Sequence, residues 1–284
     1  MPSKTLVTDW FTEKSSETGV GFSLQIKGLL QEKTTPFQHI QIYDTTHFGH
    51  LMVIDGIIML TQRENFFYHE MMTHPALLTH PKPQHIAIIG GGDCGSLKEV
   101  LKHETVKTVT QIEIDEQVTL LAREYFPELC QNNDDPRANL LFKDGIHWMK
   151  EAKPAALDII IVDSTDPIGP AEGLFNVAFY KSCFKALQPN GILVQQSGSP
   201  LIHQKLLKSM HQAMHEAGFI KTQTLLFPQP VYPSGLWSAT MASVSGDLTH
   251  FRQDKTLLNK LKPQYYTPTI HLGALECPPF VNLL

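Results

Sequence analysis

A short apolar run that leads into a glycine-rich loop constrains the fold of this chain more than any other feature of its sequence. The run His85–Ile89 predicts a strand, and GGGDCG, a GxGxxG pattern, follows it at residues 90–95. Glycines at such a strand-to-helix turn let the backbone approach a ligand, and the helix N-terminus favours polar or anionic groups. The pattern predicts a Rossmann-like domain with a nucleotide-type site, although a tight packing turn can carry the same glycines.

Strand and helix signals alternate from this loop towards the end of the chain. Short apolar strands separated by helices indicate a mostly parallel sheet that is covered on both faces. The predicted strands are His85–Ile89, Val106–Ile112, Asn139–Phe142, Leu157–Val162 and Ile192–Gln196, with Ile220–Phe227 and Trp237–Ser243 as a late hairpin. The predicted helices begin near Ser96, Asp115, Asp144 and Asn176, and a further one covers Leu201–Ala217.

The N-terminal part of the chain has the pattern of a small antiparallel sheet. Polar and apolar residues roughly alternate over Gly21–Ile26 and Gln38–Tyr43, as they do in half-buried strands. Two apolar runs, Leu51–Ile54 and Ile57–Leu60, flank Asp55-Gly56, a dipeptide that strongly favours a two-residue hairpin turn. We expect a meander of short strands in this part of the chain.

The pattern changes at about Arg63. From there to about Pro81 the apolar residues suit an amphipathic helix. We therefore expect an α/β protein in two parts: an N-terminal antiparallel β-strand domain at residues 1–62 and a Rossmann-like catalytic domain at residues 63–284.

Charge and composition exclude several classes of function. A formal net charge of −5 on 284 residues gives no electrostatic support for binding nucleic acids or membrane surfaces. The chain start lacks the apolar segment of a signal peptide, and no apolar run approaches the length of a membrane span. His211 and His215 have metal-ligand spacing but no evident third ligand, so no metal site is expected.

Four widely spaced cysteines without a CxxC pair favour reduced thiols and a cytoplasmic location; they are Cys94, Cys130, Cys183 and Cys277.

Three acidic residues predict which nucleoside the glycine-rich loop binds. Glu113 ends the next strand, where a carboxylate can accept hydrogen bonds from ribose hydroxyls, although the acid of an ordinary helix cap can stand there too. Asp93 lies inside the loop, where its charge repels a pyrophosphate and attracts a cationic donor. Asp144 follows the fourth strand and can accept from an adenine amine. Together they favour an S-adenosyl nucleoside over a dinucleotide.

The most informative segment is a fully apolar strand that ends in acidic residues. Leu157–Val162 delivers Asp163 to the carboxyl edge of the sheet, where open α/β sheets bind ligands, and Asp166 follows on a short turn. Two acids at a buried strand end are costly unless they meet a cation or a proton. The segment predicts a pocket for a protonated amine in which Asp163 takes the proton. The simpler alternative is an Asp-Pro turn that Asp163 caps.

Taken together, these residues resemble the spermidine synthase family of aminopropyltransferases over nearly the whole chain. The order and spacing of the matching segments carry the resemblance, since no single segment is specific. The segments are Trp10-Phe11, Phe37-Gln38, Leu51–Gly56, Phe67–Met71, Gly90–Asp93, Glu113–Asp115, Asp144-Gly145, Asp163–Pro167, Gly169–Glu172 and Tyr232–Gly235.

The resemblance implies transfer of an aminopropyl group from decarboxylated S-adenosylmethionine, as a co-substrate with no tightly bound cofactor, to putrescine. It implies a homodimer, with Asp163 as general base assisted by Tyr68. Donor-binding residues would be Gln38, His69, Gly91, Asp93, Glu113, Asp144, Gly145, Pro170 and Ala171. Acceptor-binding residues would be Trp10, Met59, Tyr68, Asp93, Asp163, Asp166 and Tyr232.

Two departures from the family pattern leave the acceptor open. Some members carry Gln where this chain has Met59, and Glu where it has Gly198, both on the acceptor side. Cadaverine, agmatine or spermidine are alternative acceptors. Two other functions are a putrescine N-methyltransferase and a non-catalytic protein that binds nucleoside or polyamine. Asp93 and Asp163 disfavour the methyltransferase, whose donor carries an additional carboxylate, and an intact Tyr68 disfavours the non-catalytic protein.

Overall fold

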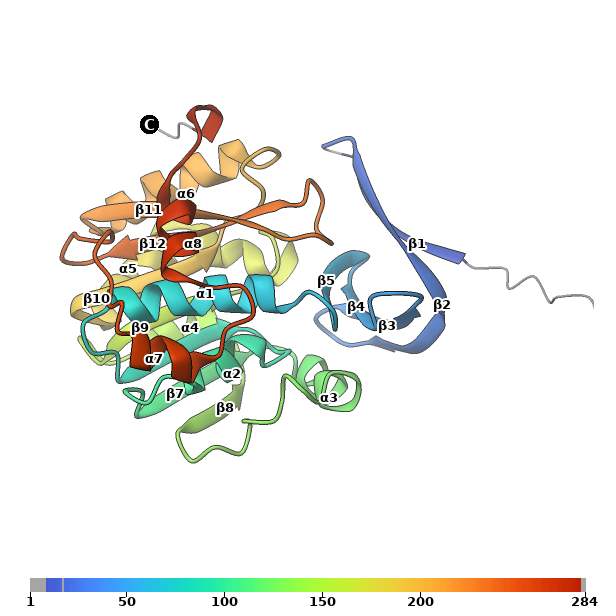
Figure 1. Cartoon of the computed structure of the whole chain (residues 1–284), viewed down its shortest axis with the longest axis horizontal. Coiled ribbons are helices and arrows are strands. Elements are labelled where there is room, and N and C mark those ends of the chain that lie inside the picture. The colour runs from blue at the N-terminus through green and yellow to red at the C-terminus, as the bar shows by residue number, and fades with distance from the viewer. Residues whose placement is uncertain (1–8, 17, 282–284) are drawn as a thin grey trace, which may run out of the picture.

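The computed structural model describes residues 9–16 and 18–281, which form two β-sheets and the helices around the larger one (Figure 1). The smaller sheet is an antiparallel meander in which the strands follow one another in chain order. Its strands are β1 (Asp9–Ser15), β2 (Val20–Thr34), β3 (His39–Thr45), β4 (His50–Ile54) and β5 (Ile57–Thr61).

The predicted hairpin at Asp55-Gly56 is confirmed. Both residues have positive φ, 50° and 81°, as a two-residue turn between twisted strands requires, and Ile54 pairs with Ile57 across it. The strand predicted at Gly21–Ile26 is part of the longer β2, which bends at two irregularities in its pairing with β3. The predicted division after residue 62 falls between β5 and the first helix; as a domain boundary it stays a prediction.

The larger sheet has seven strands in the order β11-β12-β10-β9-β6-β7-β8. The five strands from β10 to β8 are parallel, and β12 and β11 are added as an antiparallel hairpin at one edge. This is the Rossmann-like α/β fold that the sequence predicts. The strands are β6 (His85–Gly90), β7 (Thr108–Glu113), β8 (Ala138–Phe142), β9 (Leu157–Asp163), β10 (Leu187–Gln196), β11 (Lys221–Pro228) and β12 (Leu236–Ser243).

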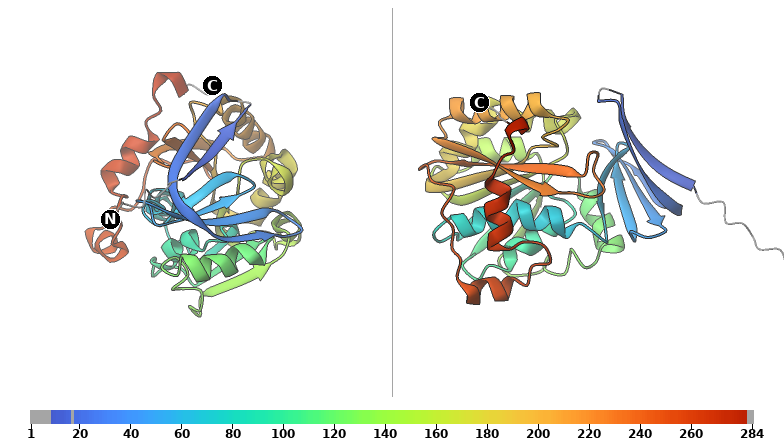
Figure 2. Two further views of the ribbon diagram at one scale, coloured as in Figure 1. Left: turned by 90° about the vertical axis from the view of Figure 1, so that its right-hand side faces the viewer. Right: turned by 45° about the horizontal axis from the view of Figure 1, so that its top comes forward.

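Helices cover both faces of the larger sheet (Figures 1 and 2). One apolar cluster joins the sheet to α1, α2, α7 and α8, and another joins its other face to α4, α5 and α6. Helix α3 packs against the smaller sheet instead and so connects the two sheets. The helices are α1 (Phe66–Thr79), α2 (Gly95–Leu101), α3 (Glu116–Tyr125), α4 (Gly145–Glu151), the 3₁₀ helix η1 (Gly169–Phe175), α5 (Val177–Ala186), α6 (Gln204–Ala217), α7 (Lys255–Leu261), α8 (Pro268–Leu275) and the 3₁₀ helix η2 (Pro279–Val281).

The prediction that α1 is amphipathic is wrong. Every residue from Tyr68 to Leu78 is buried, because α1 lies between the sheet and the C-terminal segment. The carboxylate of Glu70 accepts hydrogen bonds from the backbone N–H groups of Gln264, Tyr265 and Tyr266 at 2.7–2.9 Å. The carboxylate of Glu70 therefore binds a distant part of the chain instead of facing solvent.

The strand order places a topological switch point between β6 and β9. The chain builds outward from β6 through β7 and β8, then returns to the other side of β6 with β9 and β10. Ligands of such sheets bind at the carboxyl ends of the strands beside this point. Gly90 pairs with Asp163 there, so the glycine-rich loop and the acidic strand end lie side by side. No helix within the described residues is both long and apolar enough to cross a membrane.

Candidate active site

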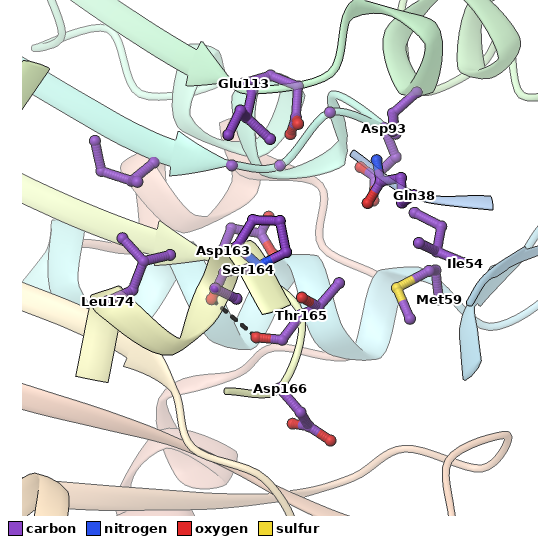
Figure 3. A pocket seen from close by; sticks show the side chains of 18 of the residues that line it. Gln38, Ile54, Met59, Asp93, Glu113, Asp163, Ser164, Thr165, Asp166 and Leu174 are labelled. Carbon is purple, nitrogen blue, oxygen red and sulfur yellow. Dashed lines mark hydrogen bonds between the residues drawn. The ribbon is translucent and has the colours of Figure 1, made fainter. Parts of the chain in front are cut away.

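A pocket opens at this switch point, between the carboxyl ends of the parallel strands and the edge of the smaller sheet. In Figure 3, Asp163 lies between Glu113 at one end of the pocket and Asp166 at the other. The residues predicted to bind the substrates that line it are Gln38, Met59, Tyr68, Gly91, Asp93, Glu113, Asp144, Gly145, Asp163, Asp166, Pro170, Ala171 and Tyr232.

Asp163 is fixed by two hydroxyl groups from different helices. Tyr68 on α1 donates to Oδ1 at 2.7 Å, and Ser96 at the start of α2 donates to Oδ2 at 2.6 Å. Burial, and then the charge of Asp93, raise the pKa of Asp163, while the charge of His69 and the two hydroxyl donors act in the opposite direction. The result is a held carboxylate whose affinity for a proton exceeds that of an ordinary aspartate.

Asp93 and His69 form an ion pair behind the glycine-rich loop. The Nε2 atom of His69 lies 3.3 Å from Oδ1 of Asp93, and the backbone N–H of Gly95 donates to the same oxygen at 2.6 Å. Burial opposes charge on both side chains, but the pair outweighs it: the pKa of His69 rises to about 9 and that of Asp93 falls. Both groups are therefore charged at neutral pH. His69 supports Asp93 but does not itself line the pocket.

The loop glycines allow this close arrangement. Gly90 has a φ of 83°, and a Cβ there would lie 2.2 Å from the carbonyl oxygen of Asp163. The N–H of Gly91 donates to the same carbonyl at 2.7 Å. A side chain at residue 90 would thus push the loop away from β9 and separate Asp93 from Asp163.

Glu113 ends β7 as a buried carboxylate at the nucleoside end of the pocket. One oxygen accepts from the N–H of Asp115 at 2.9 Å. Burial raises the pKa of Glu113 to about 7, and the charge of Asp115 adds to this effect. A ligand that donates hydrogen bonds to Glu113 will therefore bind best to the ionised form.

Gln38 and Asp144 border the same end of the pocket. Gln38 lies in the turn directly before β3, and its Nε2 donates to Asp115 at 3.0 Å, so it is fixed to the start of α3. Asp144 caps α4 by accepting from the N–H of Ile146 at 2.7 Å, and its side chain is exposed. A Cβ on Gly145 would lie 2.6 Å from the side chain of Ile89, which explains the glycine.

A second pocket continues from the first beyond Asp166. Met59, Tyr68 and Tyr232 line both, and the Tyr232 hydroxyl donates to the carbonyl of Met59. The Nε2 atom of Gln196 donates to Asp166 at 3.2 Å. Burial raises the pKa of Asp166, which keeps this carboxyl a strong proton acceptor beside the cavity.

Sequence reasoning missed Glu13, a buried carboxylate that lines the second pocket. Its Oε2 accepts from the N–H of Ile58 at 2.8 Å. Burial raises the pKa of Glu13, the Ile58 bond lowers it, and the charge of Asp166 raises it further, so the two acids are close enough to interact. The order of polar and apolar residues along β1 does not reveal Glu13, because the pairing of β1 with β2 decides which side chains face the cavity. Ser96 and Gln196, the partners of Asp163 and Asp166, were missed in the same way.

Trp10 does not reach either pocket. It precedes Glu13 by three residues on β1, so the two side chains point to opposite faces of the strand. Trp10 is 60% exposed and pairs with Gln25.

Gly198, which departs from the family pattern, lies beside His203. Its φ is 72°, and a Cβ would lie 2.6 Å from Nδ1 of His203, so the histidine ring occupies the space beside it.

His211 and His215, which have metal-ligand spacing in the sequence, contact threonine hydroxyl groups. His211 contacts Thr222 and Thr224 at 2.7 and 2.8 Å, and His215 contacts Thr222 at 3.1 Å. Across residues 9–16 and 18–281, no group of three or more His, Cys, Asp or Glu side chains has the arrangement of a metal site.

Comparison with known proteins places the chain in a family. Residues 65–252 match the model of the spermine/spermidine synthase domain, and residues 9–62 match that of the spermidine synthase tetramerisation domain. The polyamine aminopropyltransferase of Methylococcus capsulatus is 59% identical over 272 residues, 96% of this chain and 95% of the relative. That of Stenotrophomonas maltophilia K279a is 54% identical over 274 residues, 96% of this chain and 97% of the relative.

Solved structures agree with these matches. A spermidine synthase in complex with the transition-state analogue AdoDATO has a TM-score of 0.91 and 32% identity, covering 99% of this chain and 95% of that one. The spermidine synthase from Thermotoga maritima has a TM-score of 0.88 and 31% identity, covering 99% and 94%. With an acidic switch-point pocket and full-length similarity of this kind, the chain belongs to the spermine/spermidine synthase family.

Proposed function

We propose that this chain transfers the aminopropyl group of decarboxylated S-adenosylmethionine to putrescine, producing spermidine and methylthioadenosine. The chain is an aminopropyltransferase, as its relatives are. The identity of the acceptor is the new part of the proposal, and it is argued from the side chains that line the pockets. The observation that supports the proposal best is the acidic lining of the two joined pockets, since Asp93, Asp163, Asp166 and Glu13 would attract substrates that carry only positive charges.

The donor would lie across the first pocket with its adenosine towards Glu113. In this proposal Glu113 accepts from the ribose hydroxyls and Asp144 accepts from the adenine amine, while Asp93 binds the ammonium of the aminopropyl group. The remaining donor contacts come from side chains and backbone around the nucleoside. They are Gln38, Gly91, Gly145, Pro170 and Ala171, with His69 acting through Asp93.

Asp163 would act as the general base. A primary ammonium has a pKa near that of lysine, about 10.4, so the acceptor arrives protonated and has no free electron pair. Asp163 takes one proton, and the nitrogen lone pair then attacks the methylene next to the sulfonium. The C–N bond forms, the C–S bond breaks towards sulfur, and the leaving group is a neutral thioether. Tyr68 keeps Asp163 oriented for this step.

The far end of the acceptor would be bound by Asp166, Glu13 and Tyr232. Asp166 and Glu13 supply carboxylates at one end of the second pocket, and Met59 with the ring of Tyr232 supplies an apolar middle. In this proposal Glu13, and not Trp10, is the residue of β1 that binds the acceptor. A diamine with charges at both ends suits this arrangement, because each ammonium meets at least one carboxylate.

A panel of amines tests the acceptor. The purified chain is incubated with decarboxylated S-adenosylmethionine and one of four amines: putrescine, cadaverine, agmatine or spermidine. The kcat/KM values of the four amines are compared, and the products are identified by mass. Putrescine is expected to have the highest value. A higher value for another amine would reject putrescine, and methylated putrescine formed from S-adenosylmethionine would support the methyltransferase instead.

We include in the proposal a homodimer in the cytoplasm, assembled through the N-terminal sheet. Support comes from the tetramerisation-domain match at residues 9–62 and from exposed apolar side chains within the same residues; they are Trp10, Leu29, Leu30 and Phe37. Sedimentation equilibrium measures the assembly. A Leu29→Glu, Leu30→Glu double variant should dissociate, and an unchanged mass of that variant would reject this interface.

A further inference from the structure

The second pocket is larger than the first, with a volume of about 370 Å³ against about 180 Å³. One part of its wall is formed by the residues around the start of α6 together with a side chain of β12. The side chains of this part are Ile202, His203, Leu206 and Trp237, and none of them lines the first pocket. Space alone therefore does not limit the length of an acceptor amine, and the chemistry of this wall decides what a longer amine would meet.

His203 has a fixed orientation in this wall. The backbone N–H of Ser199 donates to its Nδ1 at 3.0 Å, so the neutral ring carries its proton on Nε2. The ring packs edge-on against Trp237 with the ring centroids 6.0 Å apart, and Trp237 packs against Tyr232 at 4.7 Å. The histidine therefore offers a hydrogen-bond donor and apolar carbon atoms, but no atom that is free to accept a hydrogen bond from an ammonium group.

The position of His203 depends on the glycine at residue 198. A Cβ at Gly198 would lie 2.6 Å from Nδ1 and 3.2 Å from Cγ of the histidine, so a side chain there would displace the ring. The N–H of Gly198 donates to Oε1 of Gln196 at 3.1 Å, and Nε2 of Gln196 donates to Asp166 at 3.2 Å. The segment that makes room for His203 therefore also orients a carboxylate that we propose binds the far ammonium of the acceptor.

The charges in the second pocket suffice for one ammonium. Among the described residues that line it, the carboxylates are Glu13 and Asp166, and both are assigned to the far ammonium of a diamine, whose near ammonium meets Asp163. A third ammonium that extends further would meet the wall of His203 or the exposed cation Lys14, which lines the same pocket. Removing an ammonium from water without a carboxylate partner is costly.

We propose that His203, in the space that Gly198 leaves, restricts the acceptor to diamines because it places a neutral hydrogen-bond donor where a triamine needs a carboxylate. The outermost ammonium of a triamine such as spermidine would lose its water there without gaining an opposite charge. A diamine ends at Asp166 and Glu13 and does not incur this cost. The inference rests on the proposed function, because it assumes that the acceptor enters the second pocket with its near ammonium at Asp163.

Two variants of equal size at residue 203 test the role of charge. His203→Glu adds a carboxylate to the wall, and His203→Gln has the same length without the charge. The measured quantity is the kcat/KM for spermidine divided by that for putrescine, with the products identified by mass. This ratio should be about 10- to 100-fold higher in His203→Glu than in His203→Gln, the range for a hydrogen bond to a charged group. Equal ratios in the two variants would overturn the proposal.

A control variant places the same charge outside the pockets. Gln204 is the next residue along the chain, is exposed and lines neither pocket. Gln204→Glu should leave the ratio as it is in the unmodified chain, and a rise equal to that of His203→Glu would overturn the assignment to residue 203. If thermal unfolding shows that His203→Glu does not fold, Leu206→Glu and Leu206→Gln make the same comparison. Leu206 lines the same wall, and a glutamate suits the first turn of α6.

Amine binding without turnover separates this inference from the proposed function. S-adenosyl-3-thiopropylamine is the donor without its S-methyl group, so it has no sulfonium and cannot transfer its aminopropyl group. Its ammonium would occupy Asp93, so bound spermidine must extend into the second pocket. Calorimetry in its presence should show that His203→Glu binds spermidine about 10- to 100-fold more tightly than His203→Gln, and equal affinities would overturn the proposal. An unmodified chain that transfers no aminopropyl group to any amine would instead reject the proposed function, and the calorimetry would still report on His203.

Discussion

The hydroxyl of Tyr68 donates to Oδ1 of Asp163 at 2.7 Å and so joins helix α1 to the end of β9. Both side chains are buried, at 7% and 8% exposure, and line the same pocket. The bond stabilises the ionised form of Asp163. This contact sets the orientation and the proton affinity of the proposed base together.

Tyr68→Phe should reduce kcat by about 10- to 100-fold, because a hydrogen bond to a charged group contributes about 1.5–3 kcal/mol. The variant also removes a group that lowers the pKa of Asp163, so that pKa should rise. The acid limb of the kcat profile should therefore move to higher pH. A lower kcat with an unmoved profile would show that Tyr68 acts on something other than Asp163.

Asp93 should select the decarboxylated donor. The carboxylate of S-adenosylmethionine would lie close to Asp93, and two like charges about 4 Å apart at an effective dielectric near 20 repel by about 4 kcal/mol. Even a third of that gives about a tenfold preference. Calorimetry on both donors should show this preference, and Asp93→Asn should reduce it by weakening the decarboxylated donor most. Equal affinities for the unmodified chain would count against the assignment.

Nucleoside binding should depend on the ionisation of Glu113. Its pKa is raised to about 7, and ribose hydroxyls donate to the ionised form. The affinity for methylthioadenosine should therefore fall as pH decreases below about 7, by up to about tenfold per unit. Methylthioadenosine carries no ammonium, which keeps Asp93 out of the measurement. Glu113→Gln should bind weakly with little dependence on pH, and a flat profile for the unmodified chain would contradict the role.

Glu13→Gln tests the far end of the acceptor. Glutamine keeps the shape and can still accept from the N–H of Ile58, but it removes the negative charge. The KM for putrescine should rise by about tenfold or more, while the KM for butylamine, which lacks the second ammonium, should change little. Asp166→Asn should behave in the same way. If Glu13→Gln weakens both amines equally, the residue supports the fold of β5 rather than the acceptor.

The core of the site could be predicted because it depends on local patterns and one rule of sheet geometry. The loop at Gly90 and the strand end at Asp163 are each recognisable alone, and parallel strands bring their carboxyl ends to one edge. Glu13 could not be predicted, since its inward position depends on how β1 pairs with β2. The resemblance to the family implies Trp10 as an acceptor residue, but strand alternation turns it outward.

The environment of α1 shows a different limit. Its sequence has polar residues at helical spacing, and such residues usually face solvent. Here Glu70 binds backbone groups at Gln264–Tyr266, and the helices α7 and α8 cover the same face. Contacts between segments so far apart in the chain leave no local pattern, so the burial of this helix on all sides could not be predicted from its sequence.

The kinetics of Asp163→Asn test the central claim most directly. Asparagine keeps the shape of the side chain, and its one amide oxygen can accept from one of the two hydroxyl groups, that of Tyr68 or that of Ser96, but it cannot take a proton from the amine. With decarboxylated S-adenosylmethionine and putrescine, kcat should fall by about 10²- to 10⁴-fold, while calorimetry should show methylthioadenosine binding largely unchanged. Near-normal turnover by this variant would contradict the account.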